Sequence, residues 1–122
     1  MNRKRALKVV LTVAGVFFSA LVYPLVIFAR QEPALSMMFS IYVTLGVFLL
    51  LAVGNPSANA TLIAFTAWSS LVHASVMGVQ ASQNMISRSE LGGVAVFALI
   101  GIALLALAPA KPAAERAPAA AL

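Results

Sequence analysis

Four apolar stretches, each long enough to cross a lipid bilayer, constrain this chain more than any other feature of its sequence. They cover residues 9–29, 34–53, 60–81 and 91–108. About 20 residues of helix span the roughly 30 Å hydrocarbon core of a membrane. Because backbone groups in lipid must satisfy their own hydrogen bonds, apolar runs of this length form helices rather than barrel strands. The sequence therefore predicts an all-α integral membrane protein with four transmembrane helices.

The composition agrees with a membrane protein and excludes several other classes. Of the 122 residues, 62% are hydrophobic and 9% are charged, whereas soluble domains are typically about 45–50% apolar and about 25% charged. Such an apolar sequence does not stay unfolded in water, which excludes disorder for most of the chain. The sequence has no cysteine, so disulfides, thiolate metal sites and iron–sulfur clusters are excluded as well.

Short polar connections separate the four stretches and carry the signals that start helices. Pro33 suits the first turn of the second helix. Ser57 or Asn59 can cap the third helix, and residues 87–90 have the S-x-x-E form of a capping box before the fourth. Because short connections make sequential helices antiparallel neighbours, we expect residues 9–108 to form one up-down-up-down four-helix bundle.

Basic residues flank this bundle and predict its orientation. The side that holds both chain ends carries six of the eight Lys and Arg residues, namely Arg3, Lys4, Arg5, Lys8, Lys111 and Arg116. The other side carries Arg30 and Arg88, offset by Glu32 and Glu90. The positive-inside rule therefore places both termini in the cytoplasm. Residues 1–8 form the basic N-terminal segment, and residues 109–122 form a flexible tail rich in proline and alanine.

Two other interpretations of the basic N-terminus are weaker. Nucleic-acid binding needs a basic patch on a folded surface, whereas these residues flank membrane-length segments, so no nucleic-acid partner is expected. A cleaved secretory signal has an apolar region of about 7–15 residues. The apolar stretch at residues 9–29 is longer, so we expect it to be retained as a helix.

Polar residues concentrate in the third helix, which we expect to lie inside the bundle. Thr66, Ser69, His73, Gln80 and Asn84 recur at helical spacing and form one stripe. Beside it, small residues repeat every four positions at Ser70, Ala74, Gly78 and Ser82, a pattern that lets another helix approach closely. Trp68 is too deep in its span for an interfacial anchor, so packing beside His73 is expected. With Tyr23 of the first helix added, the candidate polar site consists of Tyr23, Trp68, Ser69, His73 and Gln80.

The other three helices carry fewer signals. The first has a kink predicted at Pro24, and the second has hydroxyl side chains at Ser36, Ser40 and Thr44. The fourth has no polar side chain after Glu90 and is expected to pack through Gly93 and Gly101.

His73 is the only histidine and lies near the middle of its helix. Its imidazole could hydrogen-bond a hydroxyl on a neighbouring helix, contact a small ligand such as a quinone, or ligate haem. A haem held by two histidines would need a second chain. One histidine without a carboxylate in the membrane cannot build a catalytic triad. We therefore expect no enzyme activity and assign no catalytic, metal-binding or cofactor-binding residue.

Several segments together resemble a known family. They are residues 31–35, 40–46, 55–57 and 67–74, with Met77 and Gln80. The chain is similar to an uncharacterised family of small bacterial four-helix membrane proteins, and the similarity covers nearly all of it except the tail. The resemblance implies a bacterial inner-membrane location and this topology, but no activity. It makes Trp68, His73 and Gln80 natural candidates for a shared site.

Three functions remain open at this point. The first is a structural or accessory subunit that assembles through its small-residue faces with itself or with a larger membrane partner. The second is a carrier or binding module for a neutral or amphipathic small molecule that contacts His73. The third and weakest is a redox subunit linked to haem or quinone. The absence of charged residues inside the spans, beyond Lys8 at one edge, argues against ion-coupled transport, which usually places such charges at mid-membrane.

Overall fold

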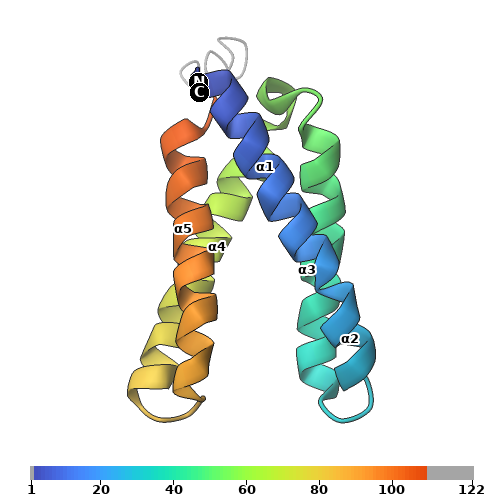
Figure 1. The fold of residues 1–122 in the computed structure, drawn as a ribbon, viewed down its shortest axis with the longest axis vertical. Helices are drawn as coiled ribbons and strands as arrows, with labels where there is room; N and C mark the ends of the chain where they lie inside the picture. The colour runs from blue at the N-terminus through green and yellow to red at the C-terminus, as the bar shows by residue number, and fades with distance from the viewer. Residues whose placement is uncertain (1, 110–122) are drawn as a thin grey trace, which may run out of the picture. The chain divides into compact units, whose positions relative to one another are not determined.

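The computed structural model describes residues 2–109, and this part of the chain is helical (Figure 1). Its elements are α1 (Arg3–Ala20), α2 (Val22–Phe28), α3 (Pro33–Ala52), η1 (Pro56–Asn59), α4 (Ala60–Ser82), η2 (Arg88–Glu90) and α5 (Leu91–Leu107), where η marks a 3₁₀-helix. Four helical segments are long and apolar enough to cross a membrane: Arg3–Phe28, Pro33–Ala52, Pro56–Ser82 and Arg88–Leu107. The four spans predicted from the sequence are confirmed to this extent. The flexible tail was predicted for residues 109–122, of which 110–122 lie outside the described residues.

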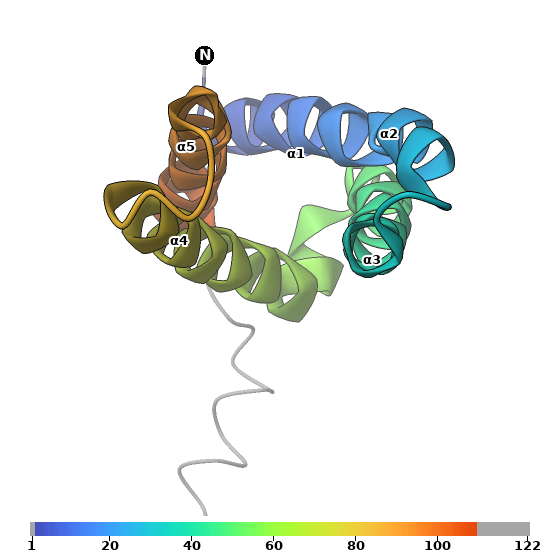
Figure 2. The ribbon, with the colours of Figure 1, turned by 90° about the horizontal axis from the view of Figure 1, so that it is seen from below.

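The described chain divides into two compact units where the sequence predicts one domain. The first, Met1–Ala58, contains α1, α2 and α3, and the second, Asn59–Leu122, contains α4 and α5. We call them hairpin 1 and hairpin 2. In hairpin 1, α2 lies directly beside α3 at the connecting loop (Figure 2). Each hairpin is antiparallel, because contact partners run in opposite directions along its helices. In hairpin 1, Phe18 meets Tyr42 and the earlier Gly15 meets the later Gly46. In hairpin 2, His73 meets Phe97 and the earlier Ala67 meets the later Gly101.

The first helix begins before its apolar stretch and breaks within it. The Asn2 side chain accepts a hydrogen bond of 2.8 Å from the backbone N–H of Arg5, so α1 starts at Arg3 and includes basic residues that we assigned to a separate segment. Further along, α1 ends at Ala20 and α2 begins at Val22. Ala20 lies four residues before Pro24, which has no N–H to donate to its carbonyl. The predicted kink is therefore present, and it lies one turn before the proline.

The other helix ends follow local chemistry. Pro33 occupies the first turn of α3, as predicted. Ser87 accepts a hydrogen bond from the Ser89 backbone N–H and caps η2 rather than α5 directly. At the end of α4, the N–H of Met85 bonds the carbonyl of Gln80 and that of Asn84 bonds the carbonyl of Ala81. Asn84 has a positive φ of 58°, so this is a Schellman motif. Asn84 therefore ends the helix and is not part of the predicted polar stripe.

Hairpin 1 closes through a backbone contact between two glycines. A β-carbon on Gly46 would lie 2.5 Å from the backbone nitrogen of Ser19 and 2.9 Å from the carbonyl oxygen of Gly15. A β-carbon on Gly15 would in turn lie 3.1 Å from the Gly46 oxygen. The Cα–H of each glycine thus points toward the carbonyl of the other, which is the arrangement of weak Cα–H···O hydrogen bonds between helices. Only residues without a side chain let α1 and α3 approach this closely.

A side-chain hydrogen bond joins α2 to α3 near the loop of hairpin 1. The buried Ser36 hydroxyl of α3 donates to the backbone oxygen of Leu25 in α2, at 3.1 Å. The other two hydroxyls predicted along α3 bond their own helix, since Ser40 donates to the oxygen of Met37 and Thr44 to that of Ser40. Ser36 therefore holds the short helix α2 against α3, a role that its spacing alone did not distinguish from the roles of Ser40 and Thr44.

Candidate functional site

The polar residues of α4 occupy positions of very different exposure. Thr66 and Ser70 are fully buried, whereas Ser69 and His73 are partly exposed. Gln80 is also partly exposed and lies near the C-terminal end of α4, about 10 Å along the helix axis from His73 at 1.5 Å per residue. The polar stripe is therefore present on the helix, but its members do not converge on one point.

Most hydroxyls along α4 are bonded to their own helix. Thr66 donates to the carbonyl of Leu62, Ser69 to that of Thr66, Ser75 to that of Leu71 and Ser82 to that of Val79. Such local bonds satisfy a hydroxyl in an apolar environment without a second helix. Ser70 differs from these four residues: its Oγ is buried and has no hydrogen-bond partner among the described residues.

His73 lies against an aromatic ring of the neighbouring helix. Its imidazole is 4.3 Å from the ring of Phe97 in α5, centroid to centroid, with the planes tilted by 47°. This places His73 on the side of α4 that meets α5. Among residues 2–109, no three His, Cys, Asp or Glu side chains lie close enough together to hold a metal ion.

Two members of the predicted site are not packed as expected. The Trp68 side chain is 60% exposed, and the aromatic ring packed on His73 is that of Phe97. Within hairpin 2, therefore, Trp68 does not pack beside His73 as expected, because its side chain lies on a face of α4 that α5 does not cover. Tyr23 is 73% exposed and belongs to hairpin 1, whereas His73 belongs to hairpin 2. The packing inside each hairpin therefore does not bring these two residues together.

The small-residue ridge of α4 divides into a covered half and an open half. Ser70 and Ala74 are buried, whereas a β-carbon built on Gly78 would meet nothing within 4 Å and Ser82 is exposed. The glycines that make close contact in hairpin 2 belong to α5, as predicted. A β-carbon on Gly101 would lie 2.9 Å from the Ala67 oxygen and 2.6 Å from Leu71 Cγ, and one on Gly93 would lie 3.3 Å from Met77 Cε.

The two hairpins share one packing register. Adding 55 to the numbers of Phe18, Tyr42 and Gly46 yields the numbers of His73, Phe97 and Gly101. Phe18 contacts Tyr42 at 5.3 Å with a tilt of 47°, which corresponds to the contact of His73 with Phe97. Gly46 and Gly101 each approach the backbone of the preceding long helix. The hairpins are therefore two versions of one helix pair.

This register shows what distinguishes α4. The buried positions Leu11, Gly15 and Phe18 of hairpin 1 correspond to Thr66, Ser70 and His73 of hairpin 2. Hairpin 1 fills these positions without a polar side chain, whereas hairpin 2 places two hydroxyls and an imidazole there. Packing alone does not require polar groups at these positions, since burying them costs free energy unless they are hydrogen-bonded.

The sequence reasoning missed Phe97 and the shared register. One signal for them was available, because residues 46–50 read Gly-Val-Phe-Leu-Leu and residues 101–105 read Gly-Ile-Ala-Leu-Leu. The rest of the two helix pairs differs too much in sequence for this short similarity to be recognised as a repeat without the contacts.

Comparison with known proteins identifies a family but no activity. No curated protein and no solved structure matches this chain. A family model matches residues 2–120 and therefore includes all four helical spans, and it also extends over most of residues 109–122, which the expected similarity left out. The resemblance to an uncharacterised four-helix family is thereby confirmed, and the chain belongs to the family of unknown function DUF6632.

Proposed function

We propose that this protein is an accessory subunit of a larger membrane assembly, or of a homo-oligomer, and that it binds its partner through the open half of the α4 ridge. Gly78 carries the proposal. Glycine inside a helix is less stable than alanine by about 0.5–1 kcal/mol, and nothing within 4 Å of a β-carbon at Gly78 explains its presence. Close approach of a further helix supplies that reason, with Ala74 and Ser82 one turn to either side.

A matched pair of leucine variants tests this surface. Gly78→Leu fills the open position on α4, and Gly92→Leu fills a position on α5 that is equally open, since a β-carbon there also meets nothing within 4 Å. Gly92 lies in the first turn of α5 and has Arg88 and Val96 four residues to either side, so it is not part of a small-residue ridge. Native mass spectrometry in mild detergent and mild cross-linking in membranes report the assembly, and thermal unfolding reports the fold. We expect Gly78→Leu to break the assembly without lowering the thermal stability of the free chain. We expect Gly92→Leu to leave the assembly intact.

Three results would count against this interface. A wild-type chain that is monomeric and carries no partner in native membranes contradicts it directly. If both leucine variants lose the assembly equally, the cause is the added side-chain bulk and not a specific interface at Gly78. Loss of thermal stability in monomeric Gly78→Leu means that Gly78 is packed against another part of the same chain.

A binding site for a neutral or amphipathic small molecule beside His73 is the second candidate. The observation that favours it is the polarity of hairpin 2 at positions where hairpin 1 is apolar, together with the unpartnered buried Oγ of Ser70. Ser70 and His73 are three residues apart on α4 and so share one side of the helix. A hydroxyl and an imidazole can there hydrogen-bond a carbonyl or hydroxyl group, as in a quinone head.

The register itself supplies the test variant. His73→Phe installs the residue that hairpin 1 has at the same position, so the helix pair should fold. If His73 binds a ligand, a small molecule retained by the purified wild type in native mass spectrometry will be absent from His73→Phe. Ser75→Ala is the control, because the Ser75 hydroxyl is exposed and bonds its own helix. A ligand-free wild type, with His73→Phe equally or more stable, refutes this candidate. A visible spectrum with a Soret band would instead favour the haem-linked alternative.

For its location, we propose a bacterial inner membrane with both termini in the cytoplasm and the four helices packed as an up-down-up-down bundle. The distribution of Lys and Arg supports this orientation. Because the chain has no cysteine, single-cysteine variants at Asn2 and Ser89 can be labelled with a membrane-impermeant maleimide in intact cells. We expect labelling at position 89 only, and labelling at position 2 in intact cells would refute the orientation.

A further inference from the structure

A groove on the first turns of α1 combines positive charge with an apolar surface. Arg5, Lys8, Val9, Thr12 and Val13 line it, and its volume is about 260 Å³. These residues are spaced by three and four positions, so they form a single stripe on one side of the helix. The groove is shallow, and all of its lining residues belong to hairpin 1.

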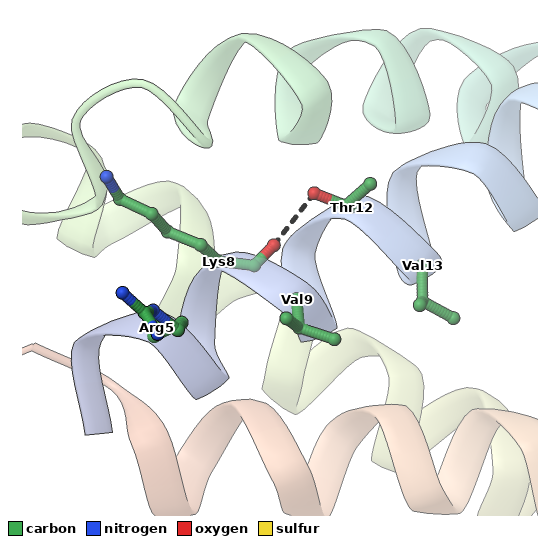
Figure 3. Close-up of a pocket in the computed structure, with 5 residues that line it drawn as sticks. All are labelled: Arg5, Lys8, Val9, Thr12 and Val13. Atoms are coloured by element: carbon green, nitrogen blue, oxygen red, sulfur yellow. Dashed lines mark hydrogen bonds between the residues drawn. The ribbon is translucent and has the colours of Figure 1, made fainter. Parts of the chain in front are cut away.

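The two cations of the groove lie at its N-terminal end. The side chains of Arg5 and Lys8 extend toward that end, while Val9 and Val13 lie further along α1 (Figure 3). Almost all of the lining surface is apolar, which means that the aliphatic stems of the basic residues form the wall and their charged groups form the rim. Thr12 adds no free polar group, because its hydroxyl donates to the Lys8 carbonyl at 2.8 Å.

Helix structure fixes these cations in position. The Asn2 cap begins α1 at Arg3, so Arg5 and Lys8 are held one turn apart rather than placed on a loose tail. No acidic side chain of hairpin 1 is near them, since its only acid, Glu32, precedes α3 at the far end of α1 and α2. Within residues 2–109, no ion pair involves Arg5 or Lys8.

We propose that this groove binds one anionic phospholipid from the leaflet that meets the N-terminal end of α1. Arg5 and Lys8 contact the lipid phosphate, and the acyl chain lies along Val9 and Val13, which are 47% and 61% exposed. Val16, also exposed, extends the apolar track to about 12 Å beyond Lys8 at 1.5 Å per residue. A free phosphate ion would satisfy the cations but leave this track uncovered, so charge and shape together favour a lipid.

Lipid counting by native mass spectrometry tests the proposal on the full chain. The protein is titrated in mild detergent with phosphatidylglycerol or with phosphatidylcholine, and the bound lipids are counted. The test variant is Arg5→Gln with Lys8→Gln, and the matched control is Arg3→Gln with Lys4→Gln, which removes two charges from the same helix end but none from the groove lining. We expect one preferred phosphatidylglycerol on the wild type, weakened about five-fold per charge lost in the test variant and retained in the control.

Two further measurements separate a lipid site from a site for a free anion. Val13→Trp fills the apolar track while keeping both cations, and we expect it to weaken phosphatidylglycerol binding. Millimolar inorganic phosphate should not displace the lipid. Equal loss in both double variants overturns the proposal in favour of diffuse attraction between charges. Equal binding of phosphatidylcholine, displacement by phosphate, or full binding to Val13→Trp overturns it as well.

Discussion

Replacing Gly46 by alanine tests the close approach of α1 and α3 in hairpin 1. The added methyl group would lie 2.5 Å from the Ser19 backbone nitrogen, 2.7 Å from Ser19 Oγ and 2.9 Å from the Gly15 oxygen. Two of these three atoms are backbone atoms and cannot rotate away. To restore ordinary contact near 3.4 Å, α1 and α3 would have to separate by roughly 1 Å at this point.

The expected cost follows from two opposing effects. Forcing an extra methyl group into a packed site costs about 1–3 kcal/mol, and separating the helices also weakens the reciprocal Cα–H···O contacts of Gly15 and Gly46. Alanine meanwhile gains about 0.5–1 kcal/mol over glycine inside a helix. We therefore expect Gly46→Ala to lower the free energy of unfolding by about 1–2 kcal/mol.

Alanine substitutions at two other glycines provide comparisons for the expected loss of stability in Gly46→Ala. A β-carbon on Gly15 meets mainly the flexible Leu50 side chain, at 2.8 Å, so Gly15→Ala should cost less than Gly46→Ala. Gly92 is open, so Gly92→Ala should be neutral or gain up to about 1 kcal/mol. Reversible unfolding in dodecylmaltoside micelles titrated with SDS, followed by circular dichroism, measures all three. A Gly46→Ala variant as stable as Gly92→Ala would show that α1 and α3 do not approach through these glycines.

Two further predictions concern single hydrogen-bonded residues in the same unfolding assay. Ser36→Ala removes the bond to the Leu25 carbonyl of α2 and should cost about 0.6 kcal/mol, the average for interhelical hydrogen bonds in membranes. Ser40→Ala removes only a bond within α3 and should cost almost nothing, so equal losses would contradict the role given to Ser36. Asn84→Ala should lower stability by about 1 kcal/mol, because alanine adopts the left-handed conformation at a cost of roughly 1–2 kcal/mol, whereas Asn84→Gly should be neutral or stabilising. If Asn84→Ala and Asn84→Gly changed the stability equally, the positive φ of 58° at Asn84 would not be the feature that ends α4.

Hairpin 2 shares the packing register of hairpin 1 but differs from it in the chemistry of the residues at that register. The paired rings and the close glycine recur 55 residues apart, yet Phe18 is replaced by His73, and Gly15 by Ser70. Ser70 has a buried hydroxyl without a hydrogen-bond partner, as Ser19 of hairpin 1 has at a different position of the register. A helix pair of this kind is complete without those polar groups, as hairpin 1 demonstrates. The search for an activity should therefore start at His73 and Ser70, and the search for a partner should start at the open Gly78.

The composition and the residues at the helix ends by themselves determined the fold class, all-α with membrane-length helices, and most of the local structure. Membrane-length apolar runs predict helices because lipid offers no hydrogen bonds to the backbone. Pro24 and Pro33 act as predicted through the covalent geometry of proline, and Gly101 allows close packing as predicted because it has no side chain. The tertiary structure alone decided which side chains meet. Periodicity places His73 and Trp68 on α4 but cannot say which residue of α5 faces each of them. Phe97 covers His73, and Trp68 is left exposed, because the glycine contacts set the register of the two helices, and that register is a property of the pair.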